Sequence, residues 1–552
     1  MNTAKKALCI LLSALLVITV LPFAVIEVTA LSDITYYLDA ENGDNSNSGT
    51  SPDEAWKDLG GFANEGVILD AGVSVLFRCG GTYDFNVTLE GLCGTEEHPF
   101  VISSYGEGQR PVLTTEAYDE VLTLIDCSYI TISDLEMVAP NGGGIWIDTI
   151  NKESVGITID NVYFHGMPNG TVNNRDDQSN GAAPARAAVM VKGLPAHSRY
   201  AVNDLTITNC EVYDCANGFM IWGSWNDEQN PWCTPDKIDP VYNTGLLISD
   251  CYFHDMDAEA VIIGICDGAL VTNCRAIDTC QGVGLDENGE IQYFTAAMWF
   301  WGSVNSTIQY CEIAGQKNYG DGMAVDFDSH THNCTYQYIY SHDNMRFMCN
   351  NAKDDTPQQN NTVRYCLSVN DNGGRSAIAS GNGENGLNFY NNTIINCADF
   401  HMRHLTNSFV ANNIIIPEDG CIILYNLTEE LSANNTYENN CYYNTINPVV
   451  DALSKNILPN FAGGTDALTA YELVEGSSLI GAGTKVEDGL TLDIFGNEIT
   501  SSNIGCYGGT GVAATENSVD SENENIFIRL AKFVECVFKI LVQEIKELIE
   551  DI

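Results

Sequence analysis

The sequence predicts an all-β protein built as a parallel β-solenoid, in which short strands stack turn upon turn around one long core. Three observations predict it. A phrase that alternates apolar and polar residues recurs along the chain, neighbouring copies are mostly about 21 to 28 residues apart, and Asn or Gly marks the turns between strands. A single turn of this size is too small to bury its own apolar residues, so stacked turns must bury a continuous column.

The repeated phrase has the period of two that is typical of β-strands. Its copies are Ile130–Leu135, Ile157–Val162, Leu205–Cys210, Leu247–Cys251, Val271–Cys274, Ile308–Cys311 and Val363–Cys366, with late copies at Phe389–Asn392 and Val410–Asn413. The apolar residue that closes each phrase is predicted to form one internal ladder of Leu135, Val162, Cys210, Cys251, Cys274, Cys311, Ile339 and Cys366. The Asn residues of the phrase mark a turn with left-handed backbone, predicted at Asn161, Asn209, Asn273, Asn391 and Asn412.

The two ends of the chain predict an exported protein with a terminal helix. Residues 1–30 have the pattern of a signal peptide, with Lys5 and Lys6 before an apolar stretch and a small-residue cleavage site at Ala30. An uncleaved membrane anchor is the alternative. The β-solenoid domain is expected over residues 31–512, an acidic linker over 513–525 and a short amphipathic helix over 526–552. Because its polar face is acidic, this helix is expected to cap the solenoid or to self-associate rather than to bind a membrane.

The net charge and the positions of the cysteines indicate which partners, disulfides and cofactors to expect. Asp and Glu number 74 against 24 Lys and Arg, a net charge of −50, which disfavours nucleic acid and anionic membranes as partners. Among the 20 cysteines, Cys210, Cys251, Cys274, Cys311 and Cys366 recur at one position of the phrase, so we expect free, buried thiols rather than disulfides. No set of His, Cys and acidic residues has the spacing of a known metal motif, so no catalytic metal or other cofactor is expected.

The densest polar segment runs from Asp321 to His332. A strand over 323–328 would point Met323, Val325 and Phe327 inward and place Asp326 and Asp328 together on the outer face. Two carboxyl groups on one face are the minimal apparatus of a glycoside hydrolase, and Asp321 at the preceding turn could reach the same face. Two alternatives remain open, namely plain solvated acids and a structural calcium site.

Aromatic residues are expected beside these acids. Trp299 and Trp301 alternate on a strand one turn earlier, and exposed tryptophans are costly unless something such as a sugar ring covers them. Trp222, together with Trp225 and Trp232, could form another wall. The alternative is that all five pack the long loops onto the solenoid. We expect His330 and His342 to orient carboxylates or to bind sugar hydroxyls.

The ends of the predicted solenoid resemble a known superfamily. Tyr36–Gly43 with Gly49–Pro52, and the closing segments Gly476–Ile480, Asp493–Gly496 and Asn503–Gly505, are similar to those of the right-handed parallel β-helix superfamily of carbohydrate-active proteins, the pectate-lyase-like fold. The resemblance covers about residues 34 to 510. It implies a right-handed parallel β-helix, but one fold hosts many functions.

The spacing of the acids resembles a narrower family. Asp321 and Asp328 are similar in spacing to the two catalytic aspartates of the β-helical lacto-N-biosidases, glycoside hydrolase family 136. The resemblance implies that Asp321 is the acid/base and Asp328 the nucleophile of a retaining enzyme that releases a disaccharide from milk-type or mucin-type glycans. Asp326 competes for either role.

Three functions remain open for a protein whose partner is a carbohydrate. A secreted glycoside hydrolase comes first because of the paired acids. A polysaccharide lyase of the same fold comes second, because it needs calcium, Arg or Lys to neutralise a uronate, and few cations are present. A non-catalytic glycan-binding or adhesin solenoid comes third.

Overall fold

The computed structural model describes residues 33–515 apart from residues 66, 68, 118, 168–186, 192–199, 225–239, 283–294, 319–321, 351–357, 374–377, 381–383, 403–404, 419–422, 426–433, 444 and 446–450. The predicted signal peptide at 1–30 and the C-terminal helix at 526–552 lie outside the described residues, as does most of the predicted linker at 513–525. Within the described part, no helix is both long enough and apolar enough to span a bilayer.

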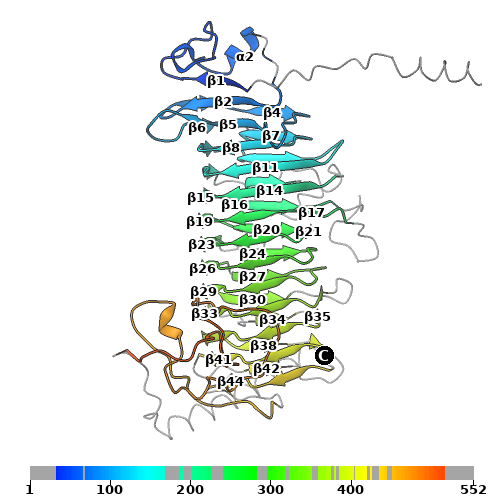
Figure 1. Ribbon diagram of the computed structural model, residues 1–552, viewed down its shortest axis with the longest axis vertical. Coiled ribbons are helices and arrows are strands. Elements are labelled where there is room, and N and C mark those ends of the chain that lie inside the picture. Colours follow the sequence, from blue (N-terminus) through cyan, green and yellow to red (C-terminus); the bar gives the residue numbers. More distant parts are fainter. Residues whose placement is uncertain are drawn as a thin grey trace, which may run out of the picture.

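The chain winds into a column of stacked strands (Figure 1). Three long sheets run along it, and paired strands within them are parallel. Sheet A has 14 strands: β1 (Ile34–Leu38), β2 (Val73–Arg78), β5 (Phe100–Tyr105), β8 (Ile130–Ser133), β11 (Ser154–Asp160), β14 (Val202–Thr208), β18 (Leu247–Ser249), β22 (Leu270–Thr272), β25 (Thr307–Gln309), β28 (Thr335–Gln337), β32 (Thr362–Arg364), β36 (Asn388–Tyr390), β40 (Phe409–Ala411) and β43 (Thr436–Glu438).

The other two long sheets repeat this order. Sheet B has 13 strands: β3 (Thr82–Asp84), β6 (Val112–Thr114), β9 (Glu136–Val138), β12 (Tyr163–Met167), β15 (Glu211–Cys215), β19 (Tyr252–His254), β23 (Arg275–Ile277), β26 (Glu312–Ala314), β29 (Tyr340–His342), β33 (Leu367–Val369), β37 (Thr393–Cys397), β41 (Ile414–Pro417) and β44 (Cys441–Tyr442). Sheet C has 10 strands: β4 (Val87–Glu90), β7 (Leu122–Ile125), β10 (Ile145–Asp148), β13 (Ala187–Val191), β16 (Asn217–Trp222), β20 (Val261–Gly264), β24 (Ala296–Trp301), β27 (Met323–Phe327), β30 (Arg346–Asn350) and β34 (Ile378–Ser380).

Short elements complete the column. Small parallel sheets form from β17 (Asn243–Thr244) with β21 (Cys266–Asp267), from β31 (Gln358–Gln359), β35 (Glu384–Asn385) and β39 (Leu405–Thr406), and from β38 (Phe400–Met402) with β42 (Ile423–Tyr425). The described helices are η1 (Pro52–Glu54), α2 (Gly60–Glu65) and η4 (Thr469–Tyr471). The predicted all-β parallel β-helix is confirmed.

Like residues stack in register along the column. Ile157 pairs with Ile130 on the turn before it and with Leu205 on the turn after it. All eight predicted ladder residues, from Leu135 to Cys366, are buried in one hydrophobic cluster that runs through the solenoid. Each described cysteine is a free thiol, as expected. The core is therefore one continuous column that no single turn could make alone.

The asparagine turns are also confirmed. Asn161, Asn209 and Asn273 have φ of 56°, 55° and 56°, and Asn391 and Asn412 have 52° and 57°. Asn tolerates this left-handed conformation because its short polar side chain hydrogen-bonds locally. Asn161, for example, donates from Nδ2 to Asp134 of the preceding turn at 2.6 Å.

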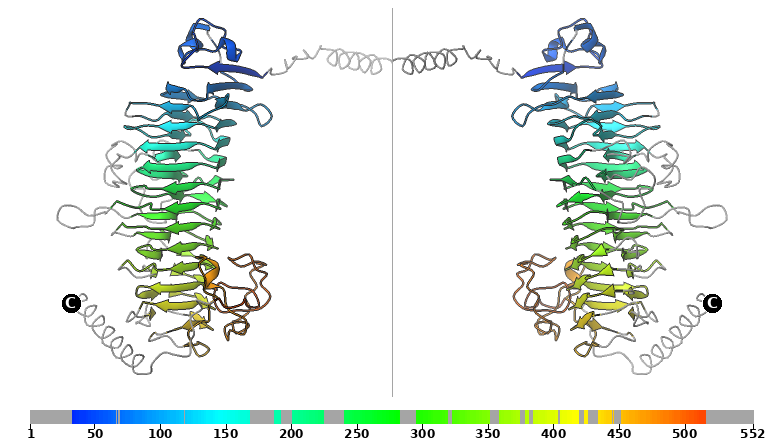
Figure 2. Two further views of the ribbon diagram at one scale, coloured as in Figure 1. Left: turned by 90° about the vertical axis from the view of Figure 1, so that its left-hand side faces the viewer. Right: turned by 90° about the vertical axis from the view of Figure 1, so that its right-hand side faces the viewer.

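The strands of the solenoid end at β44 within the described residues, earlier than the end of the predicted domain at residue 512. The following chain folds back beside the last turns (Figure 2). Leu490 and Ile494 pack on a row of turn tyrosines that includes Tyr338 and Tyr365, and the Tyr338 hydroxyl donates to the Leu492 carbonyl at 2.7 Å. This segment covers aromatic surface on the outside of the solenoid that would otherwise face water.

Candidate functional site

The candidate acids and tryptophans lie on two neighbouring strands of sheet C. Trp299 of β24 pairs in register with Asp326 of β27, and Phe300 pairs with Phe327. Parallel neighbours lie about 4.8 Å apart, so these side chains are adjacent. Phe300, Val325 and Phe327 point into the main core, whereas Trp299 and Trp301 belong to a separate cluster on the outer face. The alternation along β27 places Asp326 on that outer face.

One orientation expected from the alternation is wrong. Met323 packs in the outer cluster with Trp299 and Trp301, not in the core. Ala324 and Val325, two consecutive residues, both face the core, so the alternation is interrupted by one residue at the start of β27. The same interruption occurs at Ala297 and Met298 of the neighbouring strand. Strict alternation of inward and outward residues cannot predict such a local irregularity, even though neighbouring turns share it.

Both described acids are buried. Asp326 is 6% exposed and Asp328 is 7% exposed, which excludes the alternative of plain solvated acids. The Asp328 carboxylate accepts the Ser329 N–H at 2.7 Å and its hydroxyl at 3.1 Å. Buried carboxylates are costly without such donors, so the burial of this pair needs a reason. Asp321 lies outside the described residues.

The tryptophans were expected to be exposed, and this is wrong. Trp299 is 3% and Trp301 is 2% exposed. Trp222, which is half-buried at the end of β16, packs edge-on against both, with ring centroids 6.4 and 5.9 Å away. Gly264 pairs in register with Trp222 and Trp301, and a Cβ there would overlap the Trp222 ring. The missing side chain thus makes room for the ring. Trp225 and Trp232 lie outside the described residues.

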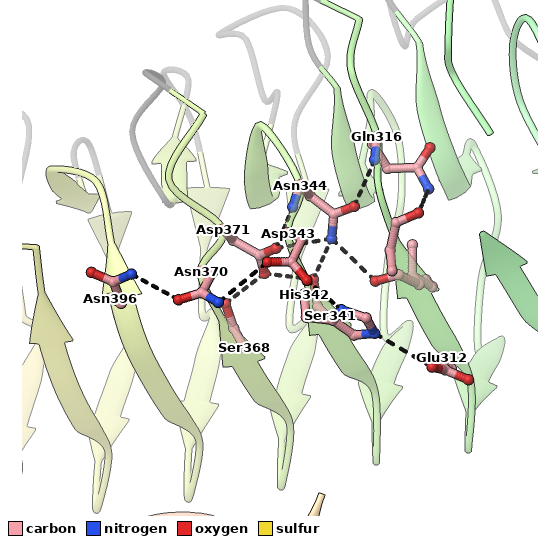
Figure 3. Close-up of polar contacts among 12 residues, drawn as sticks. Glu312, Gln316, Ser341, His342, Asp343, Asn344, Ser368, Asn370, Asp371 and Asn396 are labelled. Carbon is pink, nitrogen blue, oxygen red and sulfur yellow. Dashed lines mark hydrogen bonds and ion pairs between the residues drawn. The ribbon is translucent and has the colours of Figure 1, made fainter. Parts of the chain in front are cut away.

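The two predicted histidines are not brought together. His330 follows β27 and meets Trp301 edge to face at 5.8 Å between ring centroids, so it belongs to the candidate site. His342 lies on β29 in sheet B, a different face of the solenoid. Figure 3 shows it between Glu312 and Asp343, whose carboxylates lie 3.4 and 2.8 Å from its ring nitrogens. We assign His342 to this surface pairing rather than to the site.

Sequence reasoning missed two residues of the next turn. Cys349 of β30 pairs in register with Asp326 and packs in the outer cluster, and Arg346 pairs with Met323 and is only 5% exposed. The repeat spacing could have pointed to them, because it places β30 beside β27. They bring a thiol and a buried cation to the same face as the acids.

The core residue Tyr336 contacts β27, the strand that carries Asp326, from inside the solenoid. The Tyr336 hydroxyl donates to the backbone carbonyl of Asp326 at 2.5 Å. Burial, and next the charge of Asp326, raise the pKa of Tyr336 well above its ordinary value, so its hydroxyl stays protonated as a donor.

The described residues contain no group of three or more His, Cys, Asp and Glu side chains that could hold a metal ion. The described site contains two buried carboxylates two residues apart, those of Asp326 and Asp328, together with a tryptophan cluster and the Arg346 cation. Such an arrangement can hold an uncharged ring against aromatic surface while carboxyl groups exchange a proton.

The chain is similar to known carbohydrate-active enzymes. It is 24% identical over 585 aligned residues to a lacto-N-biosidase of Bifidobacterium longum subsp. longum, an alignment that covers 85% of this chain and 36% of that enzyme. The chain therefore spans about a third of the length of the curated relative that it matches. No family model matches.

Two solved structures of one enzyme share the fold. The native GH136 lacto-N-biosidase of Eubacterium ramulus superposes with a TM-score of 0.50 at 18% identity, over 73% of this chain and 67% of that one. Its selenomethionine derivative gives a TM-score of 0.52 at 18% identity, over 74% and 68% of the two chains. By sequence, the protein is thus a homologue of a lacto-N-biosidase, and it shares the parallel β-helix fold of a GH136 enzyme.

Proposed function

We propose that this protein is a glycoside hydrolase that cleaves oligo- or polysaccharides with a pair of aspartates. The observation that carries the proposal is the burial of Asp326 and Asp328 beside Trp299 and Trp301 on one face of sheet C. Burial of carboxylates costs free energy, and a buried pair of carboxylates beside aromatic rings fits the acids of a glycoside hydrolase. The homology to a lacto-N-biosidase supports the same class.

The proposed mechanism is retaining. Asp321 acts as acid/base and Asp328 as nucleophile, with Asp326 close enough to tune or replace one of them. Asp326 and Asp328 are two strand residues apart, roughly 6.5–7 Å between Cα atoms, which lets carboxyl groups approach one glycosidic bond. The Ser329 N–H and hydroxyl donate to the Asp328 carboxylate and orient it in its buried position. The acid/base must be protonated for the first step, and a buried site with a second carboxylate favours that.

The proposed substrate is a neutral glycan. The name of the Bifidobacterium relative points to oligosaccharides that end in lacto-N-biose, and Trp299 or Trp301 would contact such a sugar. Trp222 packs against both rings, and His330, which contacts Trp301, would bind a hydroxyl group of the sugar. We propose further that the protein is exported, which fits an enzyme that meets glycans outside the cell.

An assay of the full chain on two substrate classes tests the proposal. Incubation with neutral oligosaccharides that end in lacto-N-biose should release a new reducing end, which reducing-sugar detection and mass spectrometry would follow. Uronate polymers should give no unsaturated product absorbing in the ultraviolet. Unsaturated products would instead identify a lyase, and glycan binding without either product would identify an adhesin.

A further inference from the structure

Tyr336 places a hydroxyl group among aliphatic neighbours in its core column. Its register neighbours on the turns before and after are Ile308 and Val363, and earlier turns place Val271 and Ile248 in this inward row. A phenol hydroxyl in an aliphatic column is costly unless it has a partner. Tyr336 is fully buried, and its partner is the backbone carbonyl of Asp326, 2.5 Å away.

The ring of Tyr336 is fixed by the strands that carry the site. Its centroid lies 5.1 Å from that of Phe300 and 4.5 Å from that of Phe327. Phe300 is the inward neighbour of Trp299 and Trp301, and Phe327 is the inward neighbour of Asp326 and Asp328. Rings packed this closely restrict the rotation of the tyrosine, so its hydroxyl has a set direction.

A second core side chain holds the next peptide. Gln358, at the start of β31, is fully buried and donates from Nε2 to the Phe327 carbonyl at 2.5 Å. The two bonds therefore hold the carbonyl groups on either side of Phe327, one at Asp326 and one immediately before Asp328. The donors come from sheet A and from a short neighbouring sheet, not from sheet C itself.

We infer that Tyr336 and Gln358 are positioning residues that fix the acid-bearing end of β27 from inside the solenoid. This inference rests on the proposed function. Neither side chain reaches the outer face, so neither contacts substrate. Each acts through the backbone that carries Asp326 and Asp328, because a peptide plane that cannot rotate fixes the direction of the side chains on both sides of it.

The test uses isosteric variants of the full-length protein. Tyr336→Phe removes one hydroxyl, and Gln358→Met removes one amide donor without opening a large cavity. Tyr83→Phe is the matched control, because the buried Tyr83 hydroxyl also donates to a backbone carbonyl, that of Leu38 at 3.0 Å, in the N-terminal turns remote from β27. For each, kcat and KM would be measured on the sugar that the wild type cleaves, together with Tm.

We expect kcat to fall by about 10-fold or more in Tyr336→Phe and in Gln358→Met, with KM unchanged within about twofold. Tyr83→Phe should lower Tm but leave kcat unchanged. If one site variant fails to fold, the other decides the outcome. Wild-type kcat in the folded variants, or an equal loss of kcat in Tyr83→Phe, would overturn the inference while leaving the proposed function intact. A wild type without hydrolase activity on any glycan would refute both.

Discussion

At the scale of single residues, the outer face of sheet C combines groups that are costly to bury. Asp326 and Asp328 lie beside a tryptophan cluster, and Arg346 is buried on the next strand. A core optimised for stability alone would fill these positions with apolar side chains. Under the proposed function these residues form the catalytic site, and the first two predictions concern them.

Removal of either proposed catalytic acid should nearly abolish turnover. Asp321→Asn and Asp328→Asn should each lower kcat/KM by at least about 10²-fold, because the oxocarbenium-like transition state loses its counter-charge or its leaving-group proton. Azide should rescue the nucleophile variant and give a glycosyl azide of inverted configuration. Asp343→Asn, at a turn next to sheet B, is the control and should keep full activity. Full activity in both site variants would move the chemistry to Asp326 or away from β27.

The tryptophans should affect substrate use more than the fold when an aromatic ring is kept at each position. Trp299→Phe and Trp301→Phe should raise KM several-fold, because a smaller ring covers less of the sugar, while Tm falls only slightly. Alanine at either position should also cost about 3–5 kcal/mol of stability, because both rings are buried. Michaelis kinetics together with urea unfolding would separate the two effects. An unchanged KM in both phenylalanine variants would assign these rings to packing alone.

At the scale of elements, polar groups join one turn to the next. In Figure 3, Asp371 accepts hydroxyl bonds from Ser341 and Ser368, each 2.6 Å, and backbone and side-chain N–H bonds from Asn344 at 3.0 and 2.9 Å. Asn344 in turn accepts the Gln316 N–H at 3.0 Å. These side chains satisfy buried polar groups where the strands end, so that the turns can stack closely.

Loss of the Asp371 carboxylate, which accepts these hydrogen bonds, should destabilise the C-terminal half of the solenoid. Asp371→Leu leaves the Asn344 backbone N–H and the Ser341 and Ser368 hydroxyls without the acceptor that they share, and we expect a loss of roughly 3 kcal/mol or more in the free energy of unfolding. Ser368→Ala removes one donor only and should cost about 1 kcal/mol. Urea unfolding of both variants checks the order. Equal stability of Asp371→Leu and wild type would show that the hydrogen bonds to Asp371 do not stabilise the solenoid.

The contact between Glu312 of β26 and His342 of β29 should make the stability of the protein depend on pH. Hydrogen bonding to His342, and then to Arg275, lowers the pKa of Glu312 to about 2, and the same contact raises the pKa of His342. The contribution of Glu312 is present above its ordinary pKa near 4.5 and is lost as pH falls towards 2. That of His342 is present below about 6.5 and is lost as pH rises through its raised value.

Glu312→Gln should therefore destabilise the protein most between about pH 4.5 and 6.5. The difference from wild type should disappear near pH 2 and shrink at alkaline pH, where only the pairing with Arg275 remains. Urea midpoints across this range would show it, with Glu498→Gln in the C-terminal segment as the control. A difference that does not change with pH would contradict the assignment.

At the scale of the whole molecule, the solenoid is one core without internal boundaries. The ladder cysteines 210, 251, 274 and 311 lie on successive turns, and all are buried in the same cluster. Burial raises the pKa of the Cys366 thiol to about 12, which keeps this thiol protonated and unreactive. The ladder cysteines therefore act as small apolar side chains.

Thiol titration tests this at the level of the whole chain. Folded protein should react with a thiol reagent only at a few positions, and denatured, unreduced protein should reveal most of the remaining thiols. Cys79 and Cys93, which are partly exposed, are expected among the first to react. A denatured protein with almost no free thiols would show that disulfides staple the solenoid instead.

The sequence by itself determined the solenoid, its inward ladder, its asparagine turns and the outward placement of Asp326 next to Trp299. Each follows from a period of two within a strand and a repeat between turns, both local properties of the chain. The tertiary structure alone decided that Met323 faces outward, that the tryptophans are covered, that His342 lies on another sheet, and that Tyr336 reaches the Asp326 carbonyl. These depend on the register between turns and on contacts between residues far apart in sequence, which no local pattern contains.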